Sequence, residues 1–157
     1  MTNKIAVIRI KGGIGLNIKI KDTFNMLRLY KKNNCVVLDG SPSNIGMIEK
    51  MKTIVTWGEI DQETLKSLLI NRGRLPGNKK ITEDYIKEKT KLNLDGFIKE
   101  VFESKKKLKD IPGLKLFFKL KPPTNGFERK GVKVPYSLGG VYGYRKEMIN
   151  DLIKRMI

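Results

Sequence analysis

The sequence predicts an α+β fold in which residues 1–60 form an open-faced β-α-β-α-β sandwich and residues 61–157 form an extension packed on it. Three short apolar runs, at 4–10, 35–39 and 53–60, have the length and composition of strands. Two segments with helical periodicity separate these runs, and helices of this size pack on one face of a shared sheet. The other face is then either free or covered by the extension.

The first strand, KIAVIRI, alternates its side chains between the two faces of the predicted sheet. One face receives Ala6, Ile8 and Ile10, and the other receives Ile5, Val7 and Arg9. The second strand contains the single cysteine, Cys35, which we interpret as a small buried hydrophobic residue. In the third strand we interpret Trp57 as a core residue rather than as a platform for base stacking.

Two helices connect these strands. The first spans 19–32, stops at Asn33 and Asn34, and has one apolar face. That face consists of Ile20, Phe24, Leu27 and Tyr30. The second helix begins at a cap on Ser43 and extends to Met51.

The extension begins with a helical segment, 61–104, in which nine basic and eight acidic side chains nearly balance. Its first helix has Asp61 as its cap and stops at Gly73. Two shorter amphipathic helices follow, at 81–90 and 94–107. Because acidic residues concentrate here, we interpret this segment as scaffold.

The chain after this scaffold alternates regular and irregular structure. A strand turns four apolar residues inward, Leu114, Leu116, Phe118 and Leu120. A long loop, 122–143, contains prolines, glycines and basic residues. A helix over 144–157 closes the chain, and its apolar face repeats at four-residue steps with Tyr144, Met148, Leu152 and Met156.

The charge of the chain indicates a polyanionic partner. There are 33 basic and 16 acidic residues, which give a net charge of +17 and a pI near 10.0. A lysine-rich proteome or a solubility role would spread this charge evenly, but residues 105–157 alone contain 14 basic and four acidic side chains. A field of this kind attracts nucleic acid first and an anionic membrane surface second, and no lipid-binding face is visible.

The composition argues against catalysis, cofactors and metals. The chain has no histidine, and a single cysteine cannot build the usual zinc sites. The segment GGIG at 12–15 departs from the G-x-G-x-x-G pattern, since Ile18 occupies the place of the last glycine. We therefore expect no enzyme, no cofactor and no small-molecule substrate. An RNA-modifying enzyme is a third, weaker hypothesis, because no sequence feature supports it.

The sequence also bears on location. No apolar run approaches the ~18 residues of a membrane span. The apolar run at the N-terminus has the length of a strand and lacks a signal-peptide cleavage pattern. A single cysteine allows no internal disulfide, which fits a reducing compartment. We expect a cytoplasmic protein without a membrane partner.

Several short strings occur in an order that resembles one family. They are IAVIRIKGGIG, VVLDGSPSNIGMIEKMKTIVTWGEID, LLINRGRLPGNKKITEDYI, FKLKPPTNGFERKGVK and LGGVYGYRKEMINDLIKRM. Together they resemble the large-subunit ribosomal protein L-thirty family, in its long archaeal form related to the eukaryotic protein called L-seven. The resemblance covers essentially the whole chain.

The resemblance implies a ferredoxin-like fold for residues 1–60, with an antiparallel sheet and two helices on one side. It implies a structural role in the large ribosomal subunit, with ribosomal RNA, 5S RNA near the central protuberance and neighbouring ribosomal proteins as partners. One departure concerns the string KLKPPTNGF, where Lys119 and Thr124 stand in place of family arginines, so bidentate phosphate contacts are weaker there. The alternative is a basic protein that binds RNA or DNA outside the ribosome.

The predicted RNA-binding residues fall into three segments. The opening turn supplies Lys11, Gly12 and Gly13, and the turn NRGRLPGNKK, which is otherwise an ordinary surface turn, supplies Arg72, Arg74, Lys79 and Lys80. The last third supplies phosphate ligands at Lys115, Lys119, Lys121, Arg129, Lys130, Lys133 and Arg145, close backbone approach at Gly139, Gly140 and Gly143, and base stacking at Tyr142. We expect the loop 122–143 to order on RNA, anchored at both ends by 114–120 and 144–156.

Overall fold

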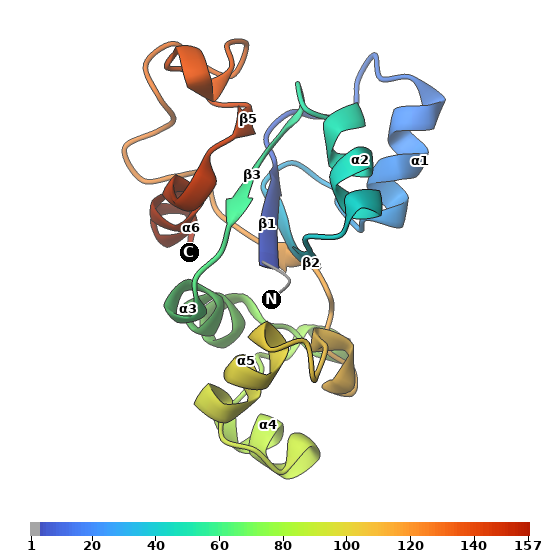
Figure 1. Ribbon diagram of the computed structural model, residues 1–157, viewed down its shortest axis with the longest axis vertical. Helices are drawn as coiled ribbons and strands as arrows, with labels where there is room; N and C mark the ends of the chain where they lie inside the picture. Colours follow the sequence, from blue (N-terminus) through green and yellow to red (C-terminus); the bar gives the residue numbers. More distant parts are fainter. Residues whose placement is uncertain (1–3) are drawn as a thin grey trace.

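A five-stranded sheet organises the computed structural model, which describes residues 4–157 (Figure 1). The strand order is β4-β2-β1-β3-β5. The strands are β1 (Lys4–Arg9), β2 (Asn34–Asp39), β3 (Val55–Glu59), β4 (Phe118–Lys119) and β5 (Gly143–Tyr144). Neighbouring strands are antiparallel except β3 and β5, which are parallel. The α+β class and the β-α-β-α-β order of the first 60 residues are confirmed.

Helices cover both faces of the sheet. The six are α1 (Ile18–Met26), α2 (Pro42–Lys50), α3 (Gln62–Arg72), α4 (Glu83–Thr90), α5 (Leu94–Phe102) and α6 (Ile149–Met156). Figure 1 shows α1 and α2 together on one side of the sheet, with α6 on the other side and α3, α4 and α5 stacked below. Short 3-10 turns at 76–78, 108–110, 136–138 and 146–148 join the later elements.

The alternation predicted for the first strand divides the core in two. Ile5 and Val7 pack with Phe24, Ile48 and other residues of α1 and α2. Ala6 and Ile8 pack instead with residues of the extension, among them Leu65, Phe97, Phe118 and Leu152. The extension therefore covers the sheet face that α1 and α2 leave open, because β1 carries apolar side chains on both faces.

Helix caps explain most of the helix starts. Asp61 caps α3 as predicted, since its side chain accepts a hydrogen bond from the Thr64 N–H at 2.6 Å. The predicted cap of α2 was wrong by two residues: Ser41, not Ser43, accepts from the Asn44 N–H. Pro42 follows the cap because its fixed φ suits the first helical position and its missing N–H needs no partner there.

The first helix is shorter than predicted. It ends at Met26 rather than at residue 32, and Arg28 and Asn33 have left-handed φ values of 60° and 64°. Beyond its end the carbonyl of Tyr30 accepts a hydrogen bond from the buried Arg9 guanidinium, so a side chain takes the place of a further helical turn. The Tyr30 ring is 49% exposed and lies outside the buried face.

The last helix also begins later than predicted. Tyr144 lies in β5, α6 starts at Ile149, and Lys146 between them has a φ of 53°. The Arg145 N–H donates to the Trp57 carbonyl at 2.8 Å, which draws this segment into the sheet. Tyr144 and Met148 are consequently exposed and do not belong to the apolar face of the helix.

Two other predicted elements are shorter than expected. Only Phe118 and Lys119 of the predicted strand 114–120 join the sheet, although its inward-facing residues are buried or half-buried. The helix predicted over 94–107 ends at Phe102, and Ser104 adopts a left-handed φ of 61°.

Strand β3 approaches the backbone before α6 very closely. A Cβ atom at Gly58 would lie 1.9 Å from the carbonyl oxygen of Lys146. We expect Gly58→Ala to lower the free energy of unfolding by about 2–4 kcal/mol, because the clash is with backbone and cannot be relieved by a rotamer change.

Urea denaturation of the purified protein measures this effect, and Gly46→Ala is the matched control. Gly46 lies inside α2 with nothing within 4 Å of an added Cβ, so the control should gain about 0.5–1 kcal/mol. Equal urea midpoints for the two variants would contradict the close approach at Gly58.

Candidate RNA-binding surface

Arg9 at the end of β1 holds the opening turn in place. Its guanidinium is buried against the Phe24 ring and donates to the carbonyls of Leu29 and Tyr30 at 2.7 and 3.0 Å. Its Nε donates to the Lys11 carbonyl at 2.9 Å. Burial lowers the pKa of Arg9, but the group keeps its charge because an arginine starts from 12.5. The turn at 12–15 therefore projects outward from a fixed base.

The tip of this turn faces solvent. Ile14 is fully exposed, and a Cβ at Gly12 would meet nothing within 4 Å. A glycine at position 13 also suits the packing inside the protein, because a Cβ there would lie 3.1 Å from the Arg9 guanidinium. The absence of a side chain at Gly12 leaves backbone N–H groups open to a ligand.

Arg145 is the centre of a buried polar network. It is 2% exposed, and its Nη1 and Nη2 donate to the two Glu128 carboxylate oxygens at 2.5 and 2.9 Å. Its Nε donates to the Thr56 hydroxyl at 2.8 Å, and Nη2 also donates to the Val141 carbonyl at 3.0 Å. The Tyr136 ring stacks at 4.5 Å. The prediction that Arg145 contacts a phosphate is therefore wrong, because its donors are already used inside the protein.

The loop 122–143 has a backbone frame of its own. The N–H groups of Tyr136, Gly140 and Val141 donate to other carbonyls of the loop at 2.7–2.9 Å. A Cβ at Gly140 would lie 2.0 Å from the Val134 carbonyl oxygen. Gly140 is thus required for internal packing, which corrects its predicted role in approaching RNA.

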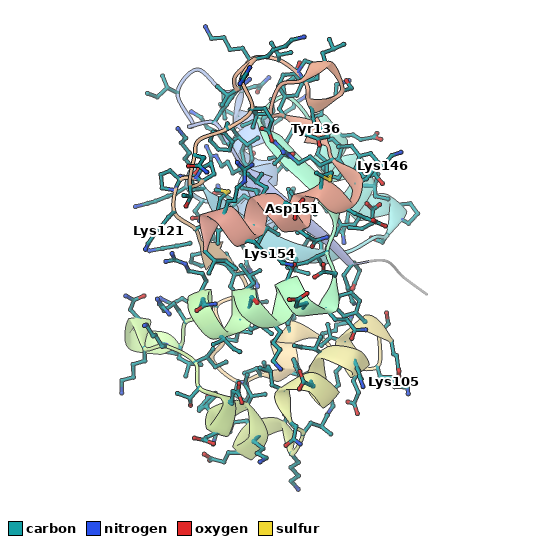
Figure 2. The ribbon with its side chains drawn as sticks, turned by 90° about the vertical axis from the view of Figure 1, so that its left-hand side faces the viewer. Lys105, Lys121, Tyr136, Lys146, Asp151 and Lys154 are labelled. Atoms are coloured by element: carbon teal, nitrogen blue, oxygen red, sulfur yellow. The ribbon has the colours of Figure 1, made fainter. Side chains whose placement is uncertain are left out.

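The loop is anchored at both ends, but by other partners than the predicted ones, since α6 holds its start and β3 holds its end. Near its start, the Lys121 and Thr124 N–H groups donate to carbonyls in the last turn of α6 at 2.9 and 3.0 Å. Near its end, the Thr56 hydroxyl donates to the Gly143 carbonyl at 2.9 Å. Figure 2 shows Lys121 beyond one end of α6 and Tyr136 near the other, so the loop starts and ends at opposite ends of this helix.

The predicted cations of the last third are mostly at the surface. Exposed residues are Lys119, Lys121, Arg129, Lys130 and Lys133. The Lys130 stem lies 3.4 Å from the Cβ position of Gly139, which takes a φ of 87° at the end of a 3-10 turn. Gly143 has a φ of 99° and nothing near its Cβ position.

The fold brings the opening turn to this loop. The Lys11 ammonium lies 5.0 Å from the centre of the Tyr142 ring, a cation–π distance. The two residues are far apart in sequence, yet both belong to the predicted RNA-binding set. We name this region, comprising residues 11–13 and the exposed cations of 119–133 with Tyr142, the basic surface.

The remaining predicted residues form a second group. The Lys115 N–H donates to the Arg74 carbonyl at 2.9 Å. The backbone of Arg74 forms an isolated antiparallel β-bridge with that of Lys80. Lys79 is exposed, whereas Arg72 is half-buried and donates to the Ile157 carbonyl at 2.7 Å. Figure 1 places α3 and α4, which flank this turn, below the sheet and the loop 122–143 above it. The two groups nevertheless approach each other at the C-terminal end of α6, where Arg72 bonds to the Ile157 carbonyl and the Lys121 N–H bonds to the Met156 carbonyl.

Glu128 was missed by the sequence reasoning. It is the one acidic residue between 122 and 143. Its position could have been recognised from the sequence, because a single carboxylate in a basic loop indicates an ion-pair partner within the protein. Partial burial raises its pKa, but hydrogen bonds from Arg145 and the backbone, together with the nearby arginine charges, outweigh burial and lower it overall.

Two further pKa values reflect local structure. Burial raises the pKa of Cys35 to about 12, in keeping with its interpretation as a buried hydrophobic residue. The Tyr144 hydroxyl donates to the Glu59 carboxylate at 2.5 Å, and this bond raises the pKa of Tyr144 to about 12.

Residues 4–157 contain neither a cluster suited to a metal ion nor a helix suited to a membrane span. Within that range no group of three or more histidine, cysteine, aspartate or glutamate residues could hold a metal ion. No helix in the same range is long and apolar enough to span a membrane.

The fold and the exposed cations define a basic ferredoxin-like α+β protein. A sequence profile of the family described as ribosomal protein L30p/L7e matches residues 5–55. The chain is 45% identical over 152 residues to "Large ribosomal subunit protein uL30" of Methanococcus maripaludis, covering 97% of this chain and 98% of that protein. Proteins of the same name from Methanopyrus kandleri and Archaeoglobus fulgidus are 45% and 46% identical and cover 94% and 96% of this chain. The chain belongs to this ribosomal protein family, the one that its sequence strings resemble.

The hydrogen bonds within the loop 122–143 change the expectation that this loop orders only on RNA. We now expect the free protein to resist proteolysis there, and Arg145→Met to expose the loop. The substitution leaves the Glu128 carboxylate without its partner, and the cost should be about 2–3 kcal/mol, below the ~3–5 kcal/mol of a fully buried pair because Glu128 is 23% exposed.

Limited proteolysis and urea denaturation test this expectation, with Lys130→Met as the control for loss of a surface cation. Cleavage within 122–143 should appear for Arg145→Met only. Equal cleavage of the wild-type loop in the absence of RNA would show that the frame does not order it.

The Glu128 pair should also make stability depend on pH. A lowered folded-state pKa means that the contribution is fully present above the ordinary value of 4.5 and is lost as the pH falls through the folded value. Urea midpoints should therefore fall more steeply below about pH 4.5 for wild type than for Glu128→Gln. Parallel pH profiles would rule out a depressed pKa at this carboxyl.

Proposed function

We propose that this protein is a structural constituent of the large ribosomal subunit, where it binds ribosomal RNA and supports translation. The observation that carries the proposal is a set of exposed cations presented on a loop that the protein frames internally. Identity of about 45% along nearly the whole chain to proteins named for that subunit supports the same role.

The proposed mechanism is binding rather than catalysis. On the basic surface, exposed lysines and Arg129 neutralise phosphates, and the open backbone at Gly12, Gly13, Gly139 and Gly143 admits close approach of RNA. Tyr142 offers a ring for stacking beside Lys11. A lysine ammonium supplies charge but lacks the rigid, planar donor geometry of an arginine guanidinium. These contacts therefore position RNA more than they read its sequence.

The second group is proposed as a separate phosphate contact. Its candidates are Arg74, Lys79, Lys80 and Lys115, with Arg72 contributing less because it also bonds to the C-terminal residue. The proposed surroundings are 5S RNA and the central protuberance, and the proposed location is the large subunit in the cytoplasm. Neighbouring ribosomal proteins complete the proposed partners, without a membrane or a small-molecule substrate.

Co-sedimentation tests the proposed role directly. We expect the protein to stay with large subunits through a high-salt sucrose gradient, because many phosphate contacts act together in an assembled particle. Release from the subunits together with bound RNA or DNA would favour a free nucleic-acid-binding protein instead.

The basic surface should set the salt dependence of RNA binding. For the triple variant Arg129→Gln, Lys130→Gln and Lys133→Gln, the slope of log K against log salt should become shallower by about 0.9 for each lost duplex contact, or roughly 2.7 in all. Filter binding to deproteinised large-subunit RNA at several salt concentrations measures the slope.

The matched control removes three exposed lysines from the charge-balanced segment 61–104 of the extension, Lys87, Lys91 and Lys99. These residues lie on or beside α4 and α5, away from the basic surface, so their replacement by glutamine should change the slope little. Equal slopes for the two triple variants would remove the loop from the proposed interface.

A further inference from the structure

A pocket of about 950 Å³ opens beside β5, and it differs in character from the basic surface. Its walls come from residues 135–137, residues 142–148 and Glu59 at the end of β3. Figure 2 shows two of these residues, Tyr136 and Lys146, near one end of α6, whereas Lys121 of the basic surface lies beyond the other end.

The rim of the pocket exposes apolar side chains. Tyr144 is 47% exposed and Met148 is 50% exposed, and both line the pocket. Leu138, next to the lining residue Ser137, is 62% exposed. Exposed apolar residues that gather around one concavity indicate a binding surface, whereas isolated ones do not.

The charge of the pocket is opposite to that of the chain. Two carboxylates line it, Glu59 and Glu147, and within residues 4–157 neither lies within 4.0 Å of a lysine or arginine nitrogen. Arg145 also lines the pocket, but its charge is paired with Glu128. Lys146 alone remains against two carboxylates, on a protein with a net charge of +17.

This combination argues against RNA as the occupant. A phosphate near the pocket would face two carboxylates that have no ion-pair partner, although Glu59 accepts a hydrogen bond from the Tyr144 hydroxyl, and like charges at an interface are unfavourable. A lysine or arginine of another polypeptide would instead be attracted by them, and an apolar side chain beside it would cover Tyr144 and Met148.

We propose that this pocket docks a basic segment of a neighbouring protein in the large subunit. An apolar residue of the segment enters between Tyr144 and Met148, and a flanking lysine or arginine pairs with Glu147 and Glu59. The proposal rests on the proposed function, because it requires the protein to sit in the subunit. It assigns the pocket to a protein and the cations of the basic surface to RNA, with Tyr142 at the border because it lines the pocket and also contacts Lys11.

Site-specific crosslinking in assembled subunits tests the proposal. Benzoylphenylalanine replaces Met148 in one strain and Lys133 in another, each variant takes the place of the wild-type chain, and large subunits are purified and irradiated. We expect position 148 to crosslink to a lysine- or arginine-rich segment of a second protein, identified by mass spectrometry of the crosslinked peptide. Position 133 should crosslink to ribosomal RNA.

The outcomes separate this proposal from the proposed function. A crosslink from position 148 to RNA, to a protein segment without basic residues, or to nothing would overturn the pocket proposal while the crosslink from 133 stands. A variant absent from purified subunits at both positions would instead count against the ribosomal role.

Charge reversal adds a second measurement. Glu147→Lys should lower the yield of the protein crosslink from position 148 roughly tenfold, because it places a cation against the basic segment. Glu88→Lys on α4 is the control; it reverses an exposed carboxylate outside the pocket and should leave the yield unchanged. An unchanged yield with Glu147→Lys would exclude charge pairing as the basis of docking.

Discussion

The guanidinium of Arg145 bonds to three parts of the chain that are far apart in sequence or lie at opposite ends of one loop. It bonds to Thr56 in the middle of β3, to Glu128 early in the loop and to the Val141 carbonyl near the loop's end. Removing this charge from water costs several kcal/mol, and only complete pairing offsets the cost. Together with the backbone hydrogen bonds of the loop, this network fixes the path of the loop and the position of the exposed cations that it carries.

Arginine and lysine have different tasks in this protein. Arg9 and Arg145 are buried and use their planar forks to bind several carbonyl and carboxylate oxygens, whereas the exposed cations of the loop are mainly lysines. The buried arginines fix the two segments that meet at Lys11 and Tyr142. The lysines, attached to these fixed segments, present charge without a rigid geometry. The buried arginines therefore fix the conformation of the two segments, and the exposed lysines supply the charge that attracts RNA.

The same network also divides the surface. Because Arg145 is neutralised by Glu128, the pocket beside β5 keeps the negative charge of Glu59 and Glu147. Lys11 of the basic surface contacts Tyr142 at the edge of this pocket, so the two areas are adjacent. The proposed assignment of one area to RNA and the other to a cationic protein segment rests on this local difference in charge.

The sequence by itself determined what local pattern can encode. The period-2 alternation of β1, the cap of α3 and the order of the first 60 residues followed from it, as did the uneven charge and the family strings. The tertiary structure alone decided that Arg145 is internal, that Gly140 is a packing residue, and that Tyr144 joins a parallel strand beside β3 rather than a helix. Periodicity reports only neighbours along the chain, whereas Thr56 and Arg145 meet across 89 residues, and a long-range partner is what turns an apparent phosphate ligand into a structural one.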